Sequence, residues 1–456
     1  MRVRAGAARS GPRLLCVRPA ATRFVPALVL SLCALVITAI VAAPGAAATS
    51  SARRAQPTNG ENETGQGACE NRQLPPPPID TSEEPKPGEP SPEPLPVPED
   101  PVGGTRMGEC GIVQPEGSKA PPKVTAATWI VTDLDSGAVL VAKDPHARER
   151  PASLIKVLLA IVVIRELSPE TVVTGTQEDA NQEGTRVGIG PGGKYTVEQL
   201  LDALVMRSGN DAAHALAGAL GGTEEAVGKM NALAKELGAL DTRAATPSGL
   251  DGPGMMTSAY DQSLIFRAAM KHEEFATAAK TARINFPGYG GKEGFQVNND
   301  NRLLGEYEGF LGGKTGFTDD ARHTYVGGAE RDGKRLAVVL LRGEREQDPL
   351  AVQGAALLDY GFELAKTDPK PVGELVTQSP EAQPKPNPNQ QNSSEVTNTV
   401  DDKAPSESAD TAADADRSAF GNVGLPLVVL AGLGVVGVGA LWLRRQRARA
   451  ARANRG

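Results

Sequence analysis

The chain has 456 residues, enough for two average domains, and a formal net charge of −7 at neutral pH. So modest a charge gives no overall case for nucleic-acid binding. The 36 prolines and 51 glycines are unevenly distributed along the chain, which predicts one globular unit between linkers rather than two domains.

The first 48 residues have the pattern of a secretory signal peptide. Six arginines are followed by an uncharged apolar run at residues 24–43 and then by a stretch of small residues that ends near Ala48. This order predicts export and cleavage after Ala48. An uncleaved membrane anchor is the alternative, because an apolar run of about 20 residues is long enough to span a bilayer.

A second apolar segment lies near the C-terminus. Residues 423–443 carry no charge, and six arginines follow them directly. Such a run can cross a hydrocarbon core of roughly 30 Å, and basic flanks stay in the cytoplasm. We therefore predict a transmembrane helix at residues 421–443, a cytoplasmic basic tail at 444–456, and a single-pass plasma-membrane protein whose folded part is extracytoplasmic. A nucleic-acid patch is disfavoured for the tail because the arginines abut the apolar run, so nucleic acid is not an expected partner.

Cysteine usage agrees with export. Cys16 and Cys33 lie in the signal region, which leaves Cys69 and Cys110 as an even pair in the exported segment. Such a pair predicts a disulfide. The four histidines are scattered and give no metal-ligand spacing, so neither a metal nor any other cofactor is expected.

Two segments of biased composition flank the predicted folded domain at residues 121–366. Residues 49–120 are rich in Pro, Glu and Gly, which predicts an extended polyproline linker outside the membrane. A tail without a task is the alternative for this segment. Residues 367–420 are polar and almost free of large apolar side chains, which predicts a disordered tether to the membrane span.

Within the domain the pattern changes from strands to helices and back. The predicted elements are, in chain order, strands 128–133 and 138–142, a helical region 153–280 broken at 208–210 and 247–254, strands 313–318, 325–329 and 335–341, the last two joined by a hairpin turn at Asp332-Gly333, and a helix 349–360. We expect an α+β fold in which one antiparallel sheet is built from both ends of the domain and flanked by helices. A helical lobe is inserted between the two halves of the sheet.

Three short motifs follow one another in this domain. Ser153-x-x-Lys156 precedes the apolar run 157–164, Ser208-x-Asn210 separates two helices, and Lys314-Thr315-Gly316 lies on a strand. Each motif alone is weak, because Ser153 could be a helix cap, 208–210 a helix break and 314–316 the entry to a turn. Together, in this order, they match the set found in penicillin-binding proteins and serine β-lactamases.

The residue types suit acyl transfer. A serine hydroxyl such as that of Ser153 needs a base, and Lys156 is suited to this role if burial and the nearby charge of Lys314 lower its pKa. Positions three apart share a helical face, which brings these two side chains together. We predict that Asn210 holds Lys156 and contacts a substrate amide, and that Ser208 relays a proton to the leaving amine.

The third motif is predicted to bind substrate. Lys314 and Thr315 offer a positive charge and a hydroxyl for a substrate carboxylate, and Gly316 allows a substrate strand to lie close to the sheet edge. An oxyanion requires preorganised N–H donors, for which we expect the backbone of Ser153 and of Phe317.

The chain resembles the low-molecular-mass penicillin-binding proteins, specifically the serine D-alanyl-D-alanine carboxypeptidases of the S11 type. The resemblance extends over about residues 124–366 and rests on the strings DPH at 144–146, RPASLIK at 150–156, MRSGNDA at 206–212, TPSGLD at 246–251 and GKTGFTDD at 313–320. It implies an acyl-enzyme on Ser153, a peptidoglycan stem peptide ending in D-Ala-D-Ala as substrate, release of the terminal D-Ala, and acylation by β-lactam antibiotics.

Some features depart from this family or leave alternatives open. Many relatives carry a second, all-β domain, where this chain has a polar linker and a membrane span. Arg342 and Arg345 are both candidates for holding the terminal carboxylate of the substrate. A class A-like β-lactamase would need a glutamate in the loop 239–251, where Asp241 and Asp251 are the only acids. A DD-endopeptidase or transpeptidase would use the same residues, and an inactive wall-binding protein is a further alternative.

Overall fold

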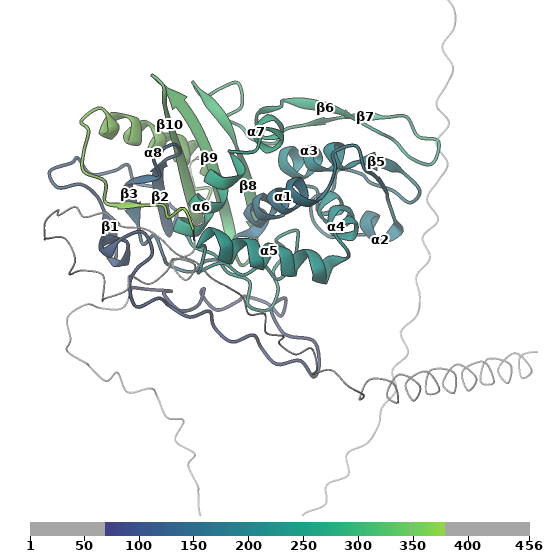
Figure 1. The fold of residues 1–456 in the computed structure, drawn as a ribbon, viewed down its shortest axis with the longest axis horizontal. Helices are drawn as coiled ribbons and strands as arrows, with labels where there is room; N and C mark the ends of the chain where they lie inside the picture. The colour runs from purple at the N-terminus through teal and green to yellow at the C-terminus, as the bar shows by residue number, and fades with distance from the viewer. Residues whose placement is uncertain (1–68, 347, 379–456) are drawn as a thin grey trace, which may run out of the picture. The chain divides into compact units, whose positions relative to one another are not determined.

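The centre of the fold is an antiparallel sheet whose strands come from both ends of the domain. The computed structural model describes residues 69–346 and 348–378 (Figure 1). The strands follow the order β1-β3-β2-β10-β9-β8, and β11 also pairs with β3. All of these pairs are antiparallel. Their bounds are β1 Ile112–Val113, β2 Thr128–Asp133, β3 Ala138–Lys143, β8 Phe310–Thr318, β9 Arg322–Arg331, β10 Lys334–Gly343 and β11 Gly373–Glu374. The sheet thus joins both ends of the domain, as predicted.

The inner strands are apolar on both faces because helices cover both sides of the sheet. Along β2, Ile130 belongs to the hydrophobic cluster shared with α1 (Ile155–Glu166) and α6 (Ala259–Ala269), whereas Val131 packs with α8 (Leu350–Ala365). Alternate side chains of one strand therefore pack into two different hydrophobic cores, one on each face of the sheet. The hairpin between β9 and β10 turns at Asp332 and Gly333, both with positive φ, which confirms the predicted turn.

The inserted helical lobe lies between β3 and β8 in the chain. Its further helices are α2 Gln177–Ala180, α3 Val197–Arg207, α4 Asn210–Ala219, α5 Thr223–Leu237 and α7 Glu273–Lys280. Two small two-stranded sheets pair β4 Val172–Thr174 with β5 Lys194–Thr196 and β6 Arg283–Phe286 with β7 Phe295–Asn298. Helix α1 is buried on every side from Ile155 to Val163, because its sequence is apolar all round. This placement carries Lys156 into the interior of the domain.

The proline-rich segment differs from the predicted linker. Residues 71–120, here called the strap, belong to the compact unit that begins at Asn71, so the folded part starts well before residue 121. The strap includes the short helix η1 (Thr105–Gly108) and strand β1. The guanidinium of Arg148, which is fully buried, donates to the carbonyl oxygens of Gln73, Leu95 and Pro96. Extended proline-rich backbone has no internal hydrogen bonds, so its carbonyls are free to accept them.

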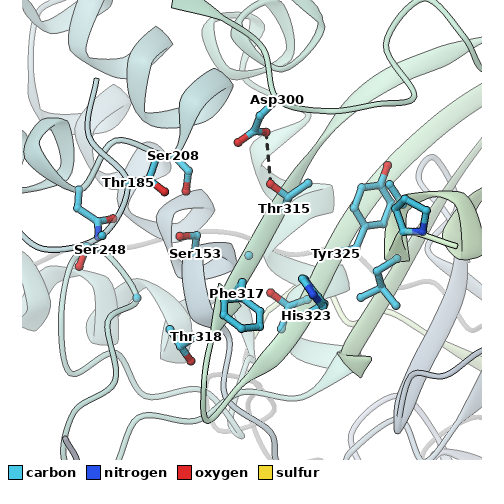
Figure 2. A pocket seen from close by; sticks show the side chains of 18 of the residues that line it. Ser153, Thr185, Ser208, Ser248, Asp300, Thr315, Phe317, Thr318, His323 and Tyr325 are labelled. Atoms are coloured by element: carbon cyan, nitrogen blue, oxygen red, sulfur yellow. Dashed lines mark hydrogen bonds between the residues drawn. The ribbon is translucent and has the colours of Figure 1, made fainter. Parts of the chain in front are cut away.

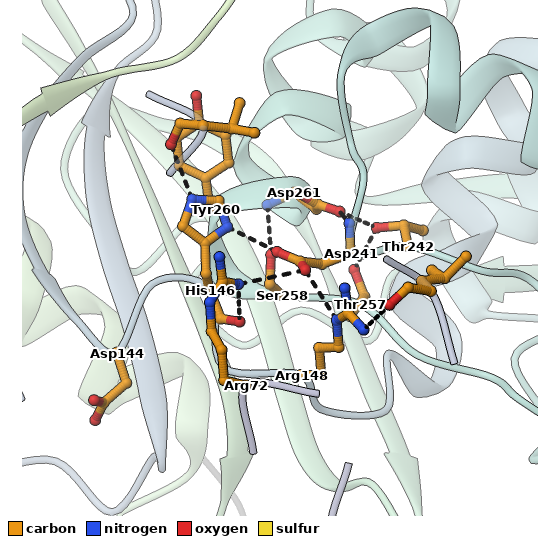
Figure 3. Close-up of polar contacts among 12 residues, drawn as sticks. Arg72, Asp144, His146, Arg148, Asp241, Thr242, Thr257, Ser258, Tyr260 and Asp261 are labelled. Carbon is orange, nitrogen blue, oxygen red and sulfur yellow. Dashed lines mark hydrogen bonds and ion pairs between the residues drawn. The ribbon is translucent and has the colours of Figure 1, made fainter. Parts of the chain in front are cut away.

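A buried polar cluster fixes the other side of Arg148 (Figure 3). Asp241 accepts from Arg148 Nε at 2.9 Å, and its second oxygen lies 2.7 Å from His146 Nδ1. His146 Nε2 lies 2.9 Å from the carbonyl oxygen of Val102 in the strap. Burial opposes ionisation of Asp241, but His146 and the two nearby arginines hold its pKa at about 2. Both ring nitrogens of His146 are thus occupied by protein groups, which makes this cluster an ion-pair core.

Both ends of the chain extend beyond the described residues. Strand β11 shows that the folded unit continues past the predicted boundary at residue 366. The predicted signal peptide at 1–48, the remainder of the tether, the membrane span at 421–443 and the basic tail at 444–456 lie outside the described residues and stay predictions. Among the residues that are described, none of the helices is long and apolar enough to span a membrane. Cys69 and Cys110 are both disulfide-bonded, in agreement with the predicted pairing.

Replacing Arg148 tests the anchoring of the strap. Arg148→Ala leaves the buried Asp241 with fewer cationic partners and removes the donor for three strap carbonyls, so we expect a loss of stability on the order of 3–5 kcal/mol. Denaturant unfolding of the exported part measures it. Arg165→Ala is the matched control, because Arg165 forms only an exposed ion pair with Glu236, worth about 0–1 kcal/mol. Equal, small effects of the two substitutions would contradict the anchoring role.

Candidate active site

The three sequence motifs meet at one cavity of about 520 Å³. Its lining includes Ser153 from the helical turn η2 (Ala152–Leu154), Ser208 and Asn210 from the junction of α3 and α4, and Thr315, Gly316 and Phe317 from β8. Figure 2 shows Ser153, Ser208 and Thr315 around this cavity. Lys156 and Lys314 are only 1% and 2% exposed. The structure therefore brings together all eight residues that the sequence predicts for the site.

Ser153 lies in a tight turn rather than in the first turn of an α-helix. The turn η2 precedes α1, which begins at Ile155. Ala152 has a φ of +47°, a strained conformation for a residue other than glycine. Gly249, with a φ of +84°, lies against this turn, and a Cβ there would come within 2.0 Å of the carbonyl oxygen of Ala152. Neighbouring backbone thus holds the serine in place.

The amine of Lys156 has three partners. It lies 2.9 Å from Ser153 Oγ and 2.8 Å from Asn210 Oδ1, and it also contacts the carbonyl oxygen of Ser248. The amide and carbonyl oxygens can only accept hydrogen bonds, whereas the serine hydroxyl can also donate. A neutral amine has two hydrogens and one lone pair. Its hydrogens therefore go to Asn210 and Ser248, and its lone pair faces the hydroxyl of Ser153.

The electrostatic surroundings favour this neutral form. Burial lowers the pKa of Lys156 well below its usual range, and the charge of Lys314 lowers it further. The pKa of Lys314 is itself lowered by burial to about 8, and Asp300 opposes this effect. Burial and the neighbouring charge thus both favour the neutral form of Lys156, while a pKa of about 8 leaves Lys314 mostly charged near neutral pH.

The second motif is fixed by the end of one helix and the start of the next. Ser208 ends α3 with a φ of +62°, and α4 begins at Asn210. Asn210 Nδ2 donates to the carbonyl oxygen of Glu183 at 2.6 Å, which orients the amide so that Oδ1 faces Lys156. The Oγ atom of Ser208 is buried and has no hydrogen-bond partner within the described residues. A buried hydroxyl without a partner at a cavity wall is suited to a ligand or a transferred proton.

The third motif lies on the strand at the end of the sheet, β8. Lys314 Nζ donates to the carbonyl oxygen of Thr315 at 2.7 Å, and Thr315 Oγ1 donates to Asp300 Oδ1 at 3.3 Å. A Cβ on Gly316 would lie 2.9 Å from the backbone nitrogen of Ser153. Glycine is therefore required for the close approach of β8 to the serine turn, a reason that the sequence alone does not reveal. Phe317 is 48% exposed at the cavity mouth.

The geometry separates the two candidate arginines. Arg342 forms an ion pair with the buried Glu149 at 2.9 Å, whereas Arg345 lines the cavity. Arg302 lines it as well and was not predicted from the sequence. Ser248, Gly249 and Asp300 were also missed as site residues. The string TPSGLD was the one signal for the first two, and no motif marks Asp300.

The two acids of the loop 239–251 lie in different surroundings. Asp241 belongs to the ion-pair core around Arg148. Asp251 accepts a hydrogen bond from Thr318 Oγ1 at 3.0 Å, and burial raises its pKa to about 6. Neither acid is among the residues that line the cavity. The described structure thus offers no carboxylate from this loop at the cavity wall.

A serine beside a buried lysine, on an antiparallel sheet flanked by helices, defines a serine-type hydrolase with a penicillin-binding-protein-like α+β fold. The chain belongs to the D-alanyl-D-alanine carboxypeptidase family of the S11 peptidase type, whose family model matches residues 116–344.

Individual relatives agree with this membership. The chain is 47% identical over 256 residues to the D-alanyl-D-alanine carboxypeptidase DacB2 of Mycobacterium tuberculosis, covering 55% of this chain and 87% of that protein. It is 30% identical over 250 residues to DacF of Bacillus subtilis, covering 54% and 64%.

Solved structures show the same fold. A D-alanyl-D-alanine carboxypeptidase from Mycobacterium tuberculosis H37Rv matches with a TM-score of 0.54 and 45% identity, covering 58% of this chain and 99% of that one. The Streptomyces K15 DD-transpeptidase matches with a TM-score of 0.51 and 27% identity, covering 54% and 100%.

Substitution of Gly316 tests the close approach of β8 to the serine turn. Gly316→Ala places a methyl group 2.3 Å from Thr324 Oγ1 and 2.9 Å from Ser153 N, so the serine must shift. We expect acylation of the protein by a fluorescent penicillin to slow by roughly tenfold or more, because small misplacements of reacting groups are costly. Gly228→Ala in α5 is the control, since nothing lies within 4 Å of a Cβ there. If both variants react at the rate of the unchanged protein, the packing argument fails.

Proposed function

We propose that this protein is a serine D-alanyl-D-alanine carboxypeptidase that removes the terminal D-Ala from peptidoglycan stem pentapeptides. The observation that carries the proposal is the 2.9 Å contact between Ser153 Oγ and the buried amine of Lys156, whose other two partners are acceptors only. The relatives support the substrate class, since DacB2 and DacF are both named as D-alanyl-D-alanine carboxypeptidases.

In the first step Lys156 takes the proton of Ser153 as Oγ attacks the carbonyl carbon between the two D-alanines. The new oxyanion is stabilised by the backbone N–H groups of Ser153 and Phe317. The C–N bond then breaks, and the leaving amine receives a proton from Lys156 through the hydroxyl of Ser208. This step leaves an acyl-enzyme ester on Ser153. Water attacks the ester as Lys156 takes its proton, Lys156 passes that proton to Ser153 Oγ as the ester C–O bond breaks, and the shortened peptide is released.

The substrate backbone is held along β8, and the substrate's C-terminal carboxylate is held separately. Strand β8 ends the sheet in the described structure, so an extended peptide can pair with it. The terminal carboxylate is bound by positive charge from Lys314 and Arg345 and by the hydroxyl of Thr315. Asn210 lies beside the substrate amide. A β-lactam carries a carboxylate and a reactive amide carbonyl, which is why it acylates the same serine.

A DD-transpeptidase or endopeptidase acting on cross-links is the second candidate function. The likeness to the Streptomyces K15 DD-transpeptidase favours it, because both reactions pass through an acyl-enzyme. The candidates differ in what accepts the acyl group, an amine or water.

A class A-like β-lactamase would hydrolyse nitrocefin many times per molecule, and one-to-one acylation would exclude it.

We infer that the enzyme acts outside the plasma membrane, where stem peptides occur. The signal-peptide pattern at 1–48 and the apolar run at 423–443 followed by arginines support this proposal. The disulfide-bonded state of Cys69 and Cys110 is a further support, because disulfides persist in oxidising compartments.

Mass spectrometry of the exported part incubated with penicillin tests the nucleophile. We expect one covalent adduct, lost in Ser153→Ala, and release of D-Ala from a D-Ala-D-Ala pentapeptide that is lost in the same variant. An adduct that persists in Ser153→Ala would remove the assignment. If the purified protein neither forms an adduct nor releases D-Ala, the alternative of an inactive wall-binding protein gains support.

Kinetics of two arginine variants test how the terminal carboxylate is held. Arg345→Ala should raise KM for a peptide with a free C-terminal carboxylate by roughly tenfold or more, with a smaller change for the C-terminal amide. Arg342→Ala is the control, because its guanidinium is engaged by Glu149. A KM that stays constant in Arg345→Ala for both peptides would exclude this residue as the anchor.

A further inference from the structure

Asp300 is the one carboxylate among the residues that line the active-site cavity in the described part of the chain. It lies between β7 and β8, and its backbone N–H donates to the carbonyl oxygen of Met206 at 3.0 Å. Figure 2 shows its side chain bound by the hydroxyl of Thr315. The proposed substrate carries a carboxylate and its reaction forms an oxyanion. A negative charge on the cavity wall therefore opposes substrate binding, and the proposed reaction gives Asp300 no task.

The buried ammonium group of Lys314 needs a counter-charge. Neither Lys156 nor Lys314 forms an ion pair with any acid of the described structure, although both are almost fully buried. Asp211 and, to a smaller extent, Asp300 are the acids that raise the pKa of Lys156. The carboxylate of Asp211 accepts hydrogen bonds from four backbone N–H groups, which fix its position. They belong to Val187, Gly188 and Ile189, in the loop before β5, and to Ala212 in α4. Asp300 is the acid that acts on Lys314.

Thr315 connects Asp300 with Lys314. Its carbonyl oxygen accepts from Lys314 Nζ, and its hydroxyl donates to Asp300. The carboxylate is thereby fixed next to the buried ammonium without contacting it. The single hydrogen of this hydroxyl points to Asp300 in the structure, so the hydroxyl binds the substrate carboxylate only after it turns away from Asp300.

We propose that Asp300 is a positioning residue whose negative charge keeps Lys314 in the ammonium form. Lys314 can then repel a proton from Lys156 and attract the substrate carboxylate at the same pH. This inference rests on the proposed function, in which Lys156 must be neutral and Lys314 charged.

The other charged groups around the cavity cannot replace Asp300. Arg302 and Arg345 are cations, so their charges disfavour the ammonium form of Lys314. His323 on β9 has its pKa lowered by burial and by Arg345, which keeps it neutral near pH 7. Asp211 raises the pKa of Lys156, whereas Asp300 is the acid that raises the pKa of Lys314.

The pH dependence of acylation tests the proposal. The rate should rise with pH as Lys156 loses its proton and fall again near pH 8 as Lys314 loses its own. Asp300→Asn keeps an oxygen that accepts from Thr315 but removes the charge, which lowers the pKa of both lysines. Both limbs of the profile, measured with a fluorescent penicillin, should therefore move to lower pH by roughly half a unit or more.

Three further variants sharpen the test. Glu306→Gln removes an exposed acid outside the cavity and should leave both limbs in place. Asp300→Glu keeps the charge and should restore limb positions close to those of the unchanged protein, and Asp300→Ala should shift them as Asp300→Asn does. A lower rate with unmoved limbs in both neutral variants would overturn the proposal and leave Asp300 a purely structural role. If the unchanged protein is not acylated at all, it is the proposed function that fails.

Discussion

The rest of the site depends on the burial of one amine. Lys156 is enclosed on a helix that is apolar all round, so its three partners must come from other parts of the chain. They are Ser153 from the turn before the helix, Asn210 from the start of α4, and Ser248 from the loop that precedes α6. The helical lobe must therefore assemble before the amine is satisfied. Burial also lowers the pKa of Lys156, so folding itself prepares the base.

The protein contains two buried clusters of polar side chains that differ in how their charges are paired. In the cluster of His146, Arg148 and Asp241, charges are paired and most polar atoms have partners, which stabilises the contact with the strap. At the active site, two lysines lie close together without an ion pair, and the hydroxyl of Ser208 has no partner in the described structure. Such unfavourable arrangements persist at functional sites because the surrounding fold imposes them.

Sequence reasoning reached the site through local patterns. The structure has a helix break at 208–210 and a strand that carries 314–316, and residues of all three motifs line one cavity. The sheet followed from β-forming runs and the Asp332-Gly333 turn. Residues defined only by tertiary contact were missed. Asp300 lies in a polar connection without periodicity, and the distinction between Arg342 and Arg345 depends on Glu149, almost 200 positions earlier.

The strap was predicted to be an extended linker for a related reason. Composition shows how much apolar surface a segment can bury by itself, but not which contacts another element provides for it. Arg148 binds the strap through backbone carbonyl oxygens, a group that every residue has. Amino-acid identity at these three positions of the strap is therefore weakly constrained, while the extended path of the backbone matters. Sequence similarity should fade there faster than structure does. The family model accordingly begins at residue 116, although the compact unit already begins at Asn71.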